Sequence, residues 1–154
     1  MLLYLVQHAE AVKEEEDPAR PLSEKGIQDI RKVASYISGF DLMIARILHS
    51  NKLRAKQTAE ALAEHLKPSS GVSETDGLAP MDNTRTWTDR LKYISENVML
   101  VGHLPHLGNL ASMLLCRDPE TGIVDFKMAG VVCLKRDEKG SWSLQWMITP
   151  EMIK

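Results

Sequence analysis

The sequence is poor in the residues on which small disulfide-rich proteins and membrane proteins depend. It has two cysteines, and aromatic residues make up 5% of its 154 residues. Cys116 and Cys133 lie in apolar settings without metal-ligand spacing, which argues against a disulfide framework and suits a reducing cytoplasm. No run approaches the roughly 20 apolar residues that span a bilayer. We therefore expect neither a secreted nor a membrane protein.

A strong charge of one sign is also missing. Nineteen basic and 21 acidic side chains give a formal net charge of −2. A nucleic-acid surface needs a broad positive stripe, so we expect no nucleic-acid partner. The first residues, MLLYLVQHAEAV, lack a basic leader and a cleavage pattern, and they predict a strand rather than a signal peptide. The composition is that of a globular protein, and we expect a single domain over residues 1–154.

Apolar runs and helical patterns alternate over the first two thirds of the chain. Each of three apolar runs, predicted as buried strands, precedes a segment with helical periodicity. Ser23 is the expected N-cap of the first helix, and Gly39 closes it. The expected strands are Leu2–Val6, Leu42–Leu48 and Val98–Val101, with a weak extended piece beginning at Val72. The expected helices run from Ser23 to Gly39 and over Leu53–Leu66, with further helices marked by Trp87, Leu91 and Ile94 and by Leu107 to Leu114.

The last third has a different pattern. Val131–Leu134 and the alternating Trp142, Leu144 and Trp146 flank a turn at residues 137–140, which predicts a terminal hairpin. The whole pattern predicts a three-layer α/β/α domain with a mainly parallel central sheet and a C-terminal antiparallel hairpin.

Polar residues follow the predicted strands at the edge where ligands bind in open α/β sheets. His8 ends the first strand, Arg54 begins the helix after the second, and His103 ends the third. Arg54 lies where helix N–H groups favour an anion, and Arg20 follows His8 in an exposed loop. Two imidazoles and two guanidinium groups suit a phosphoryl group, because one imidazole can attack while the arginines hold the oxygens.

Four sequence segments, in order, resemble the histidine phosphatase superfamily and its SixA-like branch. The strand that leads into an Arg-His-Gly motif in that family is LYLVQHAEA here. The family's Arg-Pro-Leu-Ser/Thr-x-x-Gly loop is RPLSEKG, its Ser-x-x-x-Arg-Ala-x-Gln-Thr motif is SNKLRAKQT, and its second histidine lies in GHLPHLG. The resemblance implies a phosphoglycerate mutase-like fold and metal-independent phosphatase chemistry with no cofactor. It implies that His8 is the nucleophile and that Arg20, Arg54 and His103 bind the phosphoryl group.

The sequence departs from that pattern beside the nucleophile. Gln7 stands where the family has arginine, and Ala9 where it has glycine. Gln7 can donate a hydrogen bond to phosphate but brings no charge, so we expect retuned phosphate binding. Ala9 fits only if its backbone avoids positive φ.

Other interpretations stay open for several residues. His8, His103, Arg54 and Arg20 are each compatible with a purely structural or solvated role. His103 and His106 invite a metal interpretation, but no cysteine or carboxylate joins them at ligand spacing. His49 and His65 are expected on the surface or in packing. Asp82 is a weak candidate for the general acid, since Leu104 stands where acid phosphatases have aspartate.

The missing acid and the short chain favour a labile phosphoramidate substrate. Only about 30 residues separate Leu66 from Val98, which is too few for a large lid. A phosphohistidine that projects from a protein could reach such an open site, whereas a small sugar phosphate would be poorly enclosed. The expected partner is a protein that bears phosphohistidine, such as a histidine phosphotransfer domain. A phosphohistidine-binding pseudo-enzyme and a small-molecule phosphatase or mutase are the alternatives.

Overall fold

The computed structural model describes residues 1–154 and contains one six-stranded sheet with the order β3-β2-β4-β1-β5-β6. Strands β1 to β4 run parallel to one another, whereas β5 and β6 are antiparallel to their neighbours. The strand bounds are Leu2–Gln7 (β1), Arg46–His49 (β2), Val72–Glu74 (β3), Val98–Gly102 (β4), Val131–Arg136 (β5) and Trp142–Ile148 (β6). The predicted α/β fold with a mainly parallel sheet and an antiparallel hairpin is confirmed.

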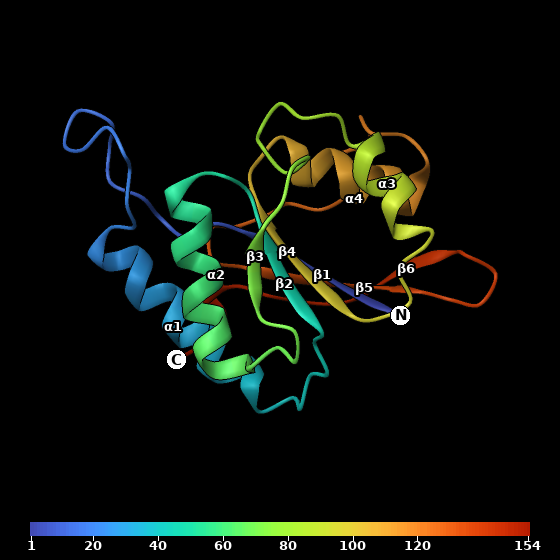
Figure 1. Cartoon of the computed structure of the whole chain (residues 1–154), viewed down its shortest axis with the longest axis horizontal. Helices are drawn as coiled ribbons and strands as arrows, with labels where there is room; N and C mark the ends of the chain where they lie inside the picture. Colours follow the sequence, from blue (N-terminus) through green and yellow to red (C-terminus); the bar gives the residue numbers. More distant parts are fainter.

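Helices cover both faces of the sheet. Figure 1 shows α1 and α2 on one face and α3 and α4 on the other. None of them combines the length and apolar character that crossing a bilayer requires. The helix bounds are Glu24–Ser38 (α1), Leu53–Leu66 (α2), Arg85–Leu91 (α3) and His106–Cys116 (α4), and a 3-10 turn, Pro150–Met152, follows β6.

The two central strands, β1 and β4, are buried on both faces because each contributes to two cores. In β1, Tyr4 and Val6 pack into the core under α1 and α2. Leu3 and Leu5 alternate with them and pack into the core under α3 and α4. This double burial explains the nearly unbroken apolar runs. It also fixes the register that brings the carboxyl ends of β1 and β4 together, with Gln7 opposite Gly102.

Two predicted boundaries are wrong. The second strand begins at Arg46 rather than Leu42, because its partner β4 begins at Val98 and the ladder cannot extend beyond it. The third helix ends at Leu91, so Ile94 lies outside it, although Ile94 still packs against the core. Apolar residues before β2 and after α3 contribute to burial without belonging to the elements.

The terminal hairpin departs from simple alternation. A β-bulge between Cys133 and Leu134 shifts the register, so that Cys133 lies opposite Trp146 and Leu134 opposite Leu144. The shift moves two tryptophans that the sequence places on one face to opposite faces of the sheet. Trp146 packs against the core under α1 and α2, and Trp142 packs against the core under α3 and α4.

Candidate active site

Two histidines meet at the carboxyl edge of the central strands. His8 follows β1, and its backbone N–H donates to the Gly102 carbonyl at 3.0 Å. His103 follows β4, and the two imidazole centroids are 5.0 Å apart at 51°. The parallel pairing of β1 and β4 is the cause, because it sets the residues after Gln7 and Gly102 side by side.

The His8 ring is held in one tautomer. Its Nδ1 lies 2.7 Å from the Ala9 carbonyl oxygen, which can only accept, so Nδ1 bears the proton and Nε2 keeps a free lone pair. Burial lowers the pKa of His8 to about 4, with the Ala9 bond opposing that shift and the charge of Arg54 adding to it. The imidazole is therefore neutral near pH 7, as a nucleophile requires.

His103 is held by a serine that follows the neighbouring strand β2. The Ser50 hydroxyl, just beyond β2, lies 2.6 Å from His103 Nε2, whereas Nδ1 is buried without a hydrogen-bond partner in the chain. Burial lowers the pKa of His103 to about 3. The charges of His8, Arg54 and Lys52 act in the same direction. A phosphoryl dianion would oppose these effects and favour the protonated ring.

Two arginines supply positive charge beside the histidines. Arg54 lies in the first turn of α2, and its buried Nε has no partner in the chain. Burial and the charge of Arg20 both lower the pKa of Arg54. Arg20 adopts a left-handed conformation, φ 49°, and its Nε donates to the Val12 carbonyl at 3.1 Å. Like charges kept this close, beside a guanidinium donor without an acceptor, suit an anion.

Helix α2 fastens the loops of this site to one another. Thr58 accepts from the Ala9 N–H at 3.0 Å and donates to the Arg54 carbonyl at 2.7 Å. Gln57 accepts from the Leu22 N–H at 2.7 Å. Residues 54, 57 and 58 are spaced so that they share one face of the helix. The same face therefore carries the Arg54 guanidinium and positions the loop that follows His8.

The loop after His8 also depends on a glycine in α1. Ser23 caps α1 by accepting from the Gly26 N–H at 3.0 Å, as predicted, and its own N–H donates to the Glu10 carbonyl at 2.9 Å. A Cβ on Gly26 would lie 2.0 Å from the Glu10 carbonyl oxygen. Only glycine permits this approach, so the start of α1 packs directly against the loop that carries His8.

The two unusual neighbours of His8 are both accommodated. Ala9 is fully buried, and it is not among the residues with positive φ, so the condition stated for it is met. The Gln7 side-chain oxygen is buried without a hydrogen-bond partner in the chain. Glutamine at this position leaves the positive charge of the site to Arg20 and Arg54.

No hydrogen bond joins the other candidates, Asp82, His49 and His65, to the two histidines or the two arginines. Asp82 accepts from the Ala79 N–H at 2.9 Å in the loop before α3. Burial lowers the pKa of His106, and the charge of Asp82 opposes that shift. His49 is buried with Nδ1 2.8 Å from the Ser50 carbonyl, and His65 is exposed on α2. No group of three or more histidine, cysteine, aspartate or glutamate side chains is arranged to hold a metal.

The family model of the histidine phosphatase superfamily (branch 1) matches residues 3–98 of the sequence, and the chain therefore belongs to that superfamily. Phosphatase is the class of enzyme that this membership supports. The chain is similar to the phosphohistidine phosphatase SixA of Escherichia coli, with 26% identity over all of this chain and 97% of that protein. An uncharacterised Picosynechococcus protein is 35% identical over 88% of this chain and 85% of its own length. A solved structure of SixA with tungstate superimposes with a TM-score of 0.88, at 26% identity and full coverage of both chains.

Sequence reasoning identified the charged side chains but missed those that position them. From the sequence, no role is predicted for Ser50, Gln57 and Thr58, although all three belong to the segment SNKLRAKQT. The signal that could have identified these three residues is their fixed spacing from Arg54 in that segment. Glu10 was missed as well, and its part is shown by its hydrogen bonds with Ser23 and by the close approach of Gly26.

Proposed function

We propose that this chain is a metal-independent phosphohistidine phosphatase, a single domain that removes phosphoryl groups from histidine on a protein. The observation that carries the proposal is the neutral His8 ring, whose Nδ1 is tied to the Ala9 carbonyl while Nε2 is free beside His103. The similarity to SixA supports the substrate class. Two cysteines without a disulfide suit a reducing compartment, and we propose the cytoplasm.

The proposed reaction has two steps. Nε2 of His8 attacks phosphorus in line, and the bond from phosphorus to the substrate nitrogen breaks. The leaving ring, protonated on its other nitrogen, takes that electron pair and departs as neutral imidazole. Water then attacks the phosphorus on His8, releasing inorganic phosphate, and the His8 ring regains its lone pair. Arg20, Arg54 and His103 bind the phosphoryl oxygens in both steps, and one such donor is typically worth roughly 3 kcal/mol in the transition state.

The site also favours a phosphoramidate over an ester. Leu104 follows His103 where an acid would protonate a departing alkoxide, and its side chain is 41% exposed. An imidazole is a much better leaving group than an alkoxide and departs without a strong acid. The partner we propose is a protein that displays phosphohistidine on its surface, such as a histidine phosphotransfer domain.

A second candidate is a phosphohistidine-binding module without turnover. It is favoured by Gln7 and Ala9, which replace the arginine and glycine beside the family's nucleophile. The two candidates share a ligand and differ in whether phosphate is released.

The test is turnover of a phosphorylated histidine phosphotransfer domain in the presence of EDTA, compared with phosphoglycerate and a sugar phosphate. We expect release of phosphate from the protein substrate and little from the esters. Binding without release would establish the second candidate. Faster turnover of the esters would identify a small-molecule phosphatase, and a strict requirement for added metal would contradict the mechanism.

Rapid quenching with a labelled substrate tests the nucleophile. We expect an acid-labile, base-stable adduct on His8. His8→Ala should lose both label and turnover, while its affinity for tungstate should stay within about tenfold because the arginines remain. His65→Ala, at an exposed histidine, is the matched control and should keep both. Label on His103 would exchange the roles of the two histidines.

A further inference from the structure

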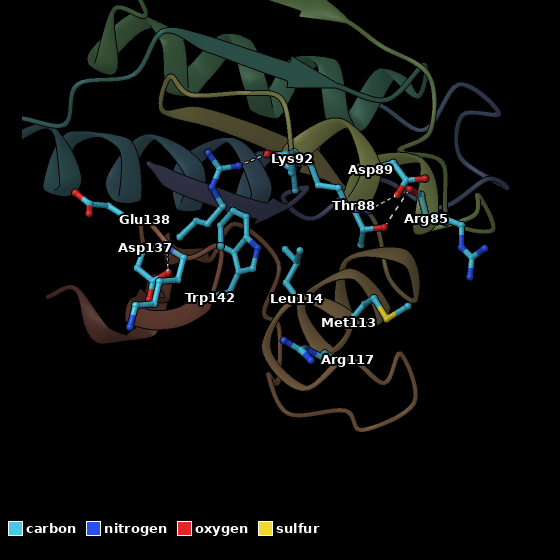
Figure 2. Close-up of a pocket in the computed structure, with 14 residues that line it drawn as sticks. Arg85, Thr88, Asp89, Lys92, Met113, Leu114, Arg117, Asp137, Glu138 and Trp142 are labelled. Carbon is cyan, nitrogen blue, oxygen red and sulfur yellow. Dashed lines mark hydrogen bonds and ion pairs between the residues drawn. The ribbon is translucent and has the colours of Figure 1, made fainter.

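A large groove lies at the end of the sheet opposite the histidines. Its volume is about 810 Å³, and three elements line it: α3, the C-terminal end of α4, and the β5–β6 hairpin. Figure 2 shows Trp142 from the hairpin and Leu114 from α4 at its centre. The hairpin turn lies beside the amino end of β1, because the Arg136 N–H donates to the Met1 carbonyl at 3.0 Å. The length of β1 therefore separates the groove from His8, roughly 20 Å at about 3.3 Å per residue.

The groove is positively charged although the whole chain is not. Its lining carries five cationic and three carboxylate side chains, against a net charge of −2 for the chain. Two of the three carboxylates are engaged within the protein. Asp89 pairs with Lys92 at 3.0 Å, and Asp137 accepts two turn N–H groups, each at 2.9 Å.

Four of the five cations of the groove have no carboxylate partner, and all of these except Arg136 are exposed. Arg85, Arg117 and Lys139 make no ion pair, and all three are exposed. They come from α3, from the residue after α4 and from the hairpin turn, so they surround the opening on different sides. Glu138 is the only lining carboxylate that does not interact with another group of the protein. The surplus of free charge is complementary to an anionic occupant.

The floor between these cations is apolar and rigid. Trp142 packs against the core under α3 and α4, and the guanidinium of Arg136 lies 5.9 Å from its ring centroid. Arg136 is itself fixed, because it donates to the Leu91 and Ile94 carbonyls. Leu114 and Met113 complete the floor. Tryptophan, arginine and methionine are enriched in protein interfaces, and tryptophan and arginine are frequent among the few residues that supply most of the binding energy.

We propose that this groove is a docking site for an acidic segment of a partner protein, one that places an apolar side chain on Trp142 and carboxylates against Arg85, Arg117 and Lys139. The apolar floor of Met113, Leu114 and Trp142 between the cations suits a peptide with an apolar side chain better than the evenly charged backbone of a nucleic acid. The groove lies far from His8, so the docked segment leaves the catalytic site free. This proposal is independent of the proposed activity.

The probe is a short labelled peptide of glutamate and aspartate with a central leucine, measured by fluorescence anisotropy beside a glutamine and asparagine counterpart. We expect the acidic peptide to bind more tightly, and its binding to weaken as salt is raised. Arg85→Glu, Arg117→Glu and Lys139→Glu combined should weaken binding about tenfold or more, a loss of at least about 1.4 kcal/mol. The matched control reverses three exposed charges on the opposite face: Arg31→Glu, Lys32→Glu and Lys67→Glu. It should bind as the unmodified protein does.

Changes in NMR chemical shift, measured for the backbone amides and the tryptophan indoles of the isotopically labelled protein, locate the bound peptide. Shifts at Arg117, Lys139 and the Trp142 indole support the proposal, and turnover unchanged by bound peptide supports the separation from His8. Equal loss in both triple variants would overturn the proposal, as would shifts confined to other surfaces or equal binding of the neutral peptide. Tighter groove binding of an oligonucleotide would overturn it in favour of nucleic acid. Self-association abolished by the groove substitutions would identify a second copy of this chain, with its acidic run Glu14–Asp17, as the occupant instead.

Discussion

The Ser50 hydroxyl and His103 Nε2 are 2.6 Å apart, and this hydrogen bond joins the loops that follow β2 and β4. Both side chains are buried, with 1% of Ser50 and 2% of His103 exposed. The same hydroxyl accepts from the Lys52 N–H, at 3.3 Å, at the start of α2. One serine therefore links the orientation of the second histidine to the helix that carries Arg54.

Ser50→Ala should reduce turnover roughly tenfold to a hundredfold, because the His103 ring loses the group that orients it toward the phosphoryl oxygens. The free energy of unfolding should fall by only about 1 kcal/mol. Steady-state kinetics and denaturant unfolding measure the two effects. Ser112→Ala is the control, since Ser112 is also buried and bonds the Gly122 N–H at 3.0 Å far from the site. Equal kinetic losses in both variants would mean that Ser50 acts only through stability.

Arg54→Ala should lower turnover by about a hundredfold or more while leaving the fold intact, because it removes a charged donor from the transferring phosphoryl group. Tungstate, which should compete with substrate in the unmodified protein, should bind this variant more weakly. Arg46→Ala removes an exposed arginine that pairs with Glu96 and should leave both measurements unchanged. A rate for Arg54→Ala equal to that of the unmodified protein would exclude Arg54 from the site.

The sequence predicts the positions of the two histidines well, because their placement follows from burial. β1 and β4 must be apolar throughout to fill two cores, so the first polar residues after them mark the strand ends and the shared edge. Parallel pairing then brings His8 and His103 together without further information. The start of β2 was mispredicted for a related reason. The residues from Leu42 are apolar, but the ladder begins only where β4 offers a partner.

The hydrogen bonds that support the candidate site could not be predicted from the sequence, because they join residues that are distant in the chain. Gln57 and Leu22 are 35 residues apart, and Ser50 and His103 are 53 apart. A sequence motif shows which residue types occur together but not which of their atoms form hydrogen bonds. The bulge in the β5–β6 hairpin was equally hidden, because it depends on how Trp146 and Leu144 pair with β5 and not on their own spacing.

Gln7→Arg should tighten tungstate binding roughly tenfold or more, because it adds a charged donor beside His8. The Gln7 oxygen is buried without a partner, so its replacement breaks no hydrogen bond within the chain. Gln7→Met keeps the length of the side chain without a donor, and it should bind tungstate no better than the unmodified protein. Isothermal titration of all three proteins gives the comparison. Weaker binding in Gln7→Arg would show that the pocket is shaped around glutamine.

Stability in acid is controlled together by half-buried His8 and by buried His103 and His106. Burial lowers the pKa of His8 to about 4 and of His103 to about 3, and it lowers the pKa of His106 as well. In the unfolded chain a histidine titrates near pH 6.5, so below that pH the unfolded state binds more protons than the folded state. Stability should be complete above about pH 6.5 and fall as the pH drops toward about 4, by up to about 1.4 kcal/mol per pH unit for each histidine.

His106→Leu isolates one of these contributions. Both ring nitrogens of His106 are buried without hydrogen-bond partners, so leucine should stabilise the fold at neutral pH by about 1 kcal/mol. Between about pH 6.5 and 5, the free energy of unfolding should also fall less steeply as the pH drops. The slope should decrease by the equivalent of up to one proton, because the unfolded state no longer takes up a proton at position 106. Urea unfolding over this pH range, with His65→Gln as the exposed control, measures the slope. A slope identical to that of the unmodified protein would show that His106 takes up its proton equally well in the folded state.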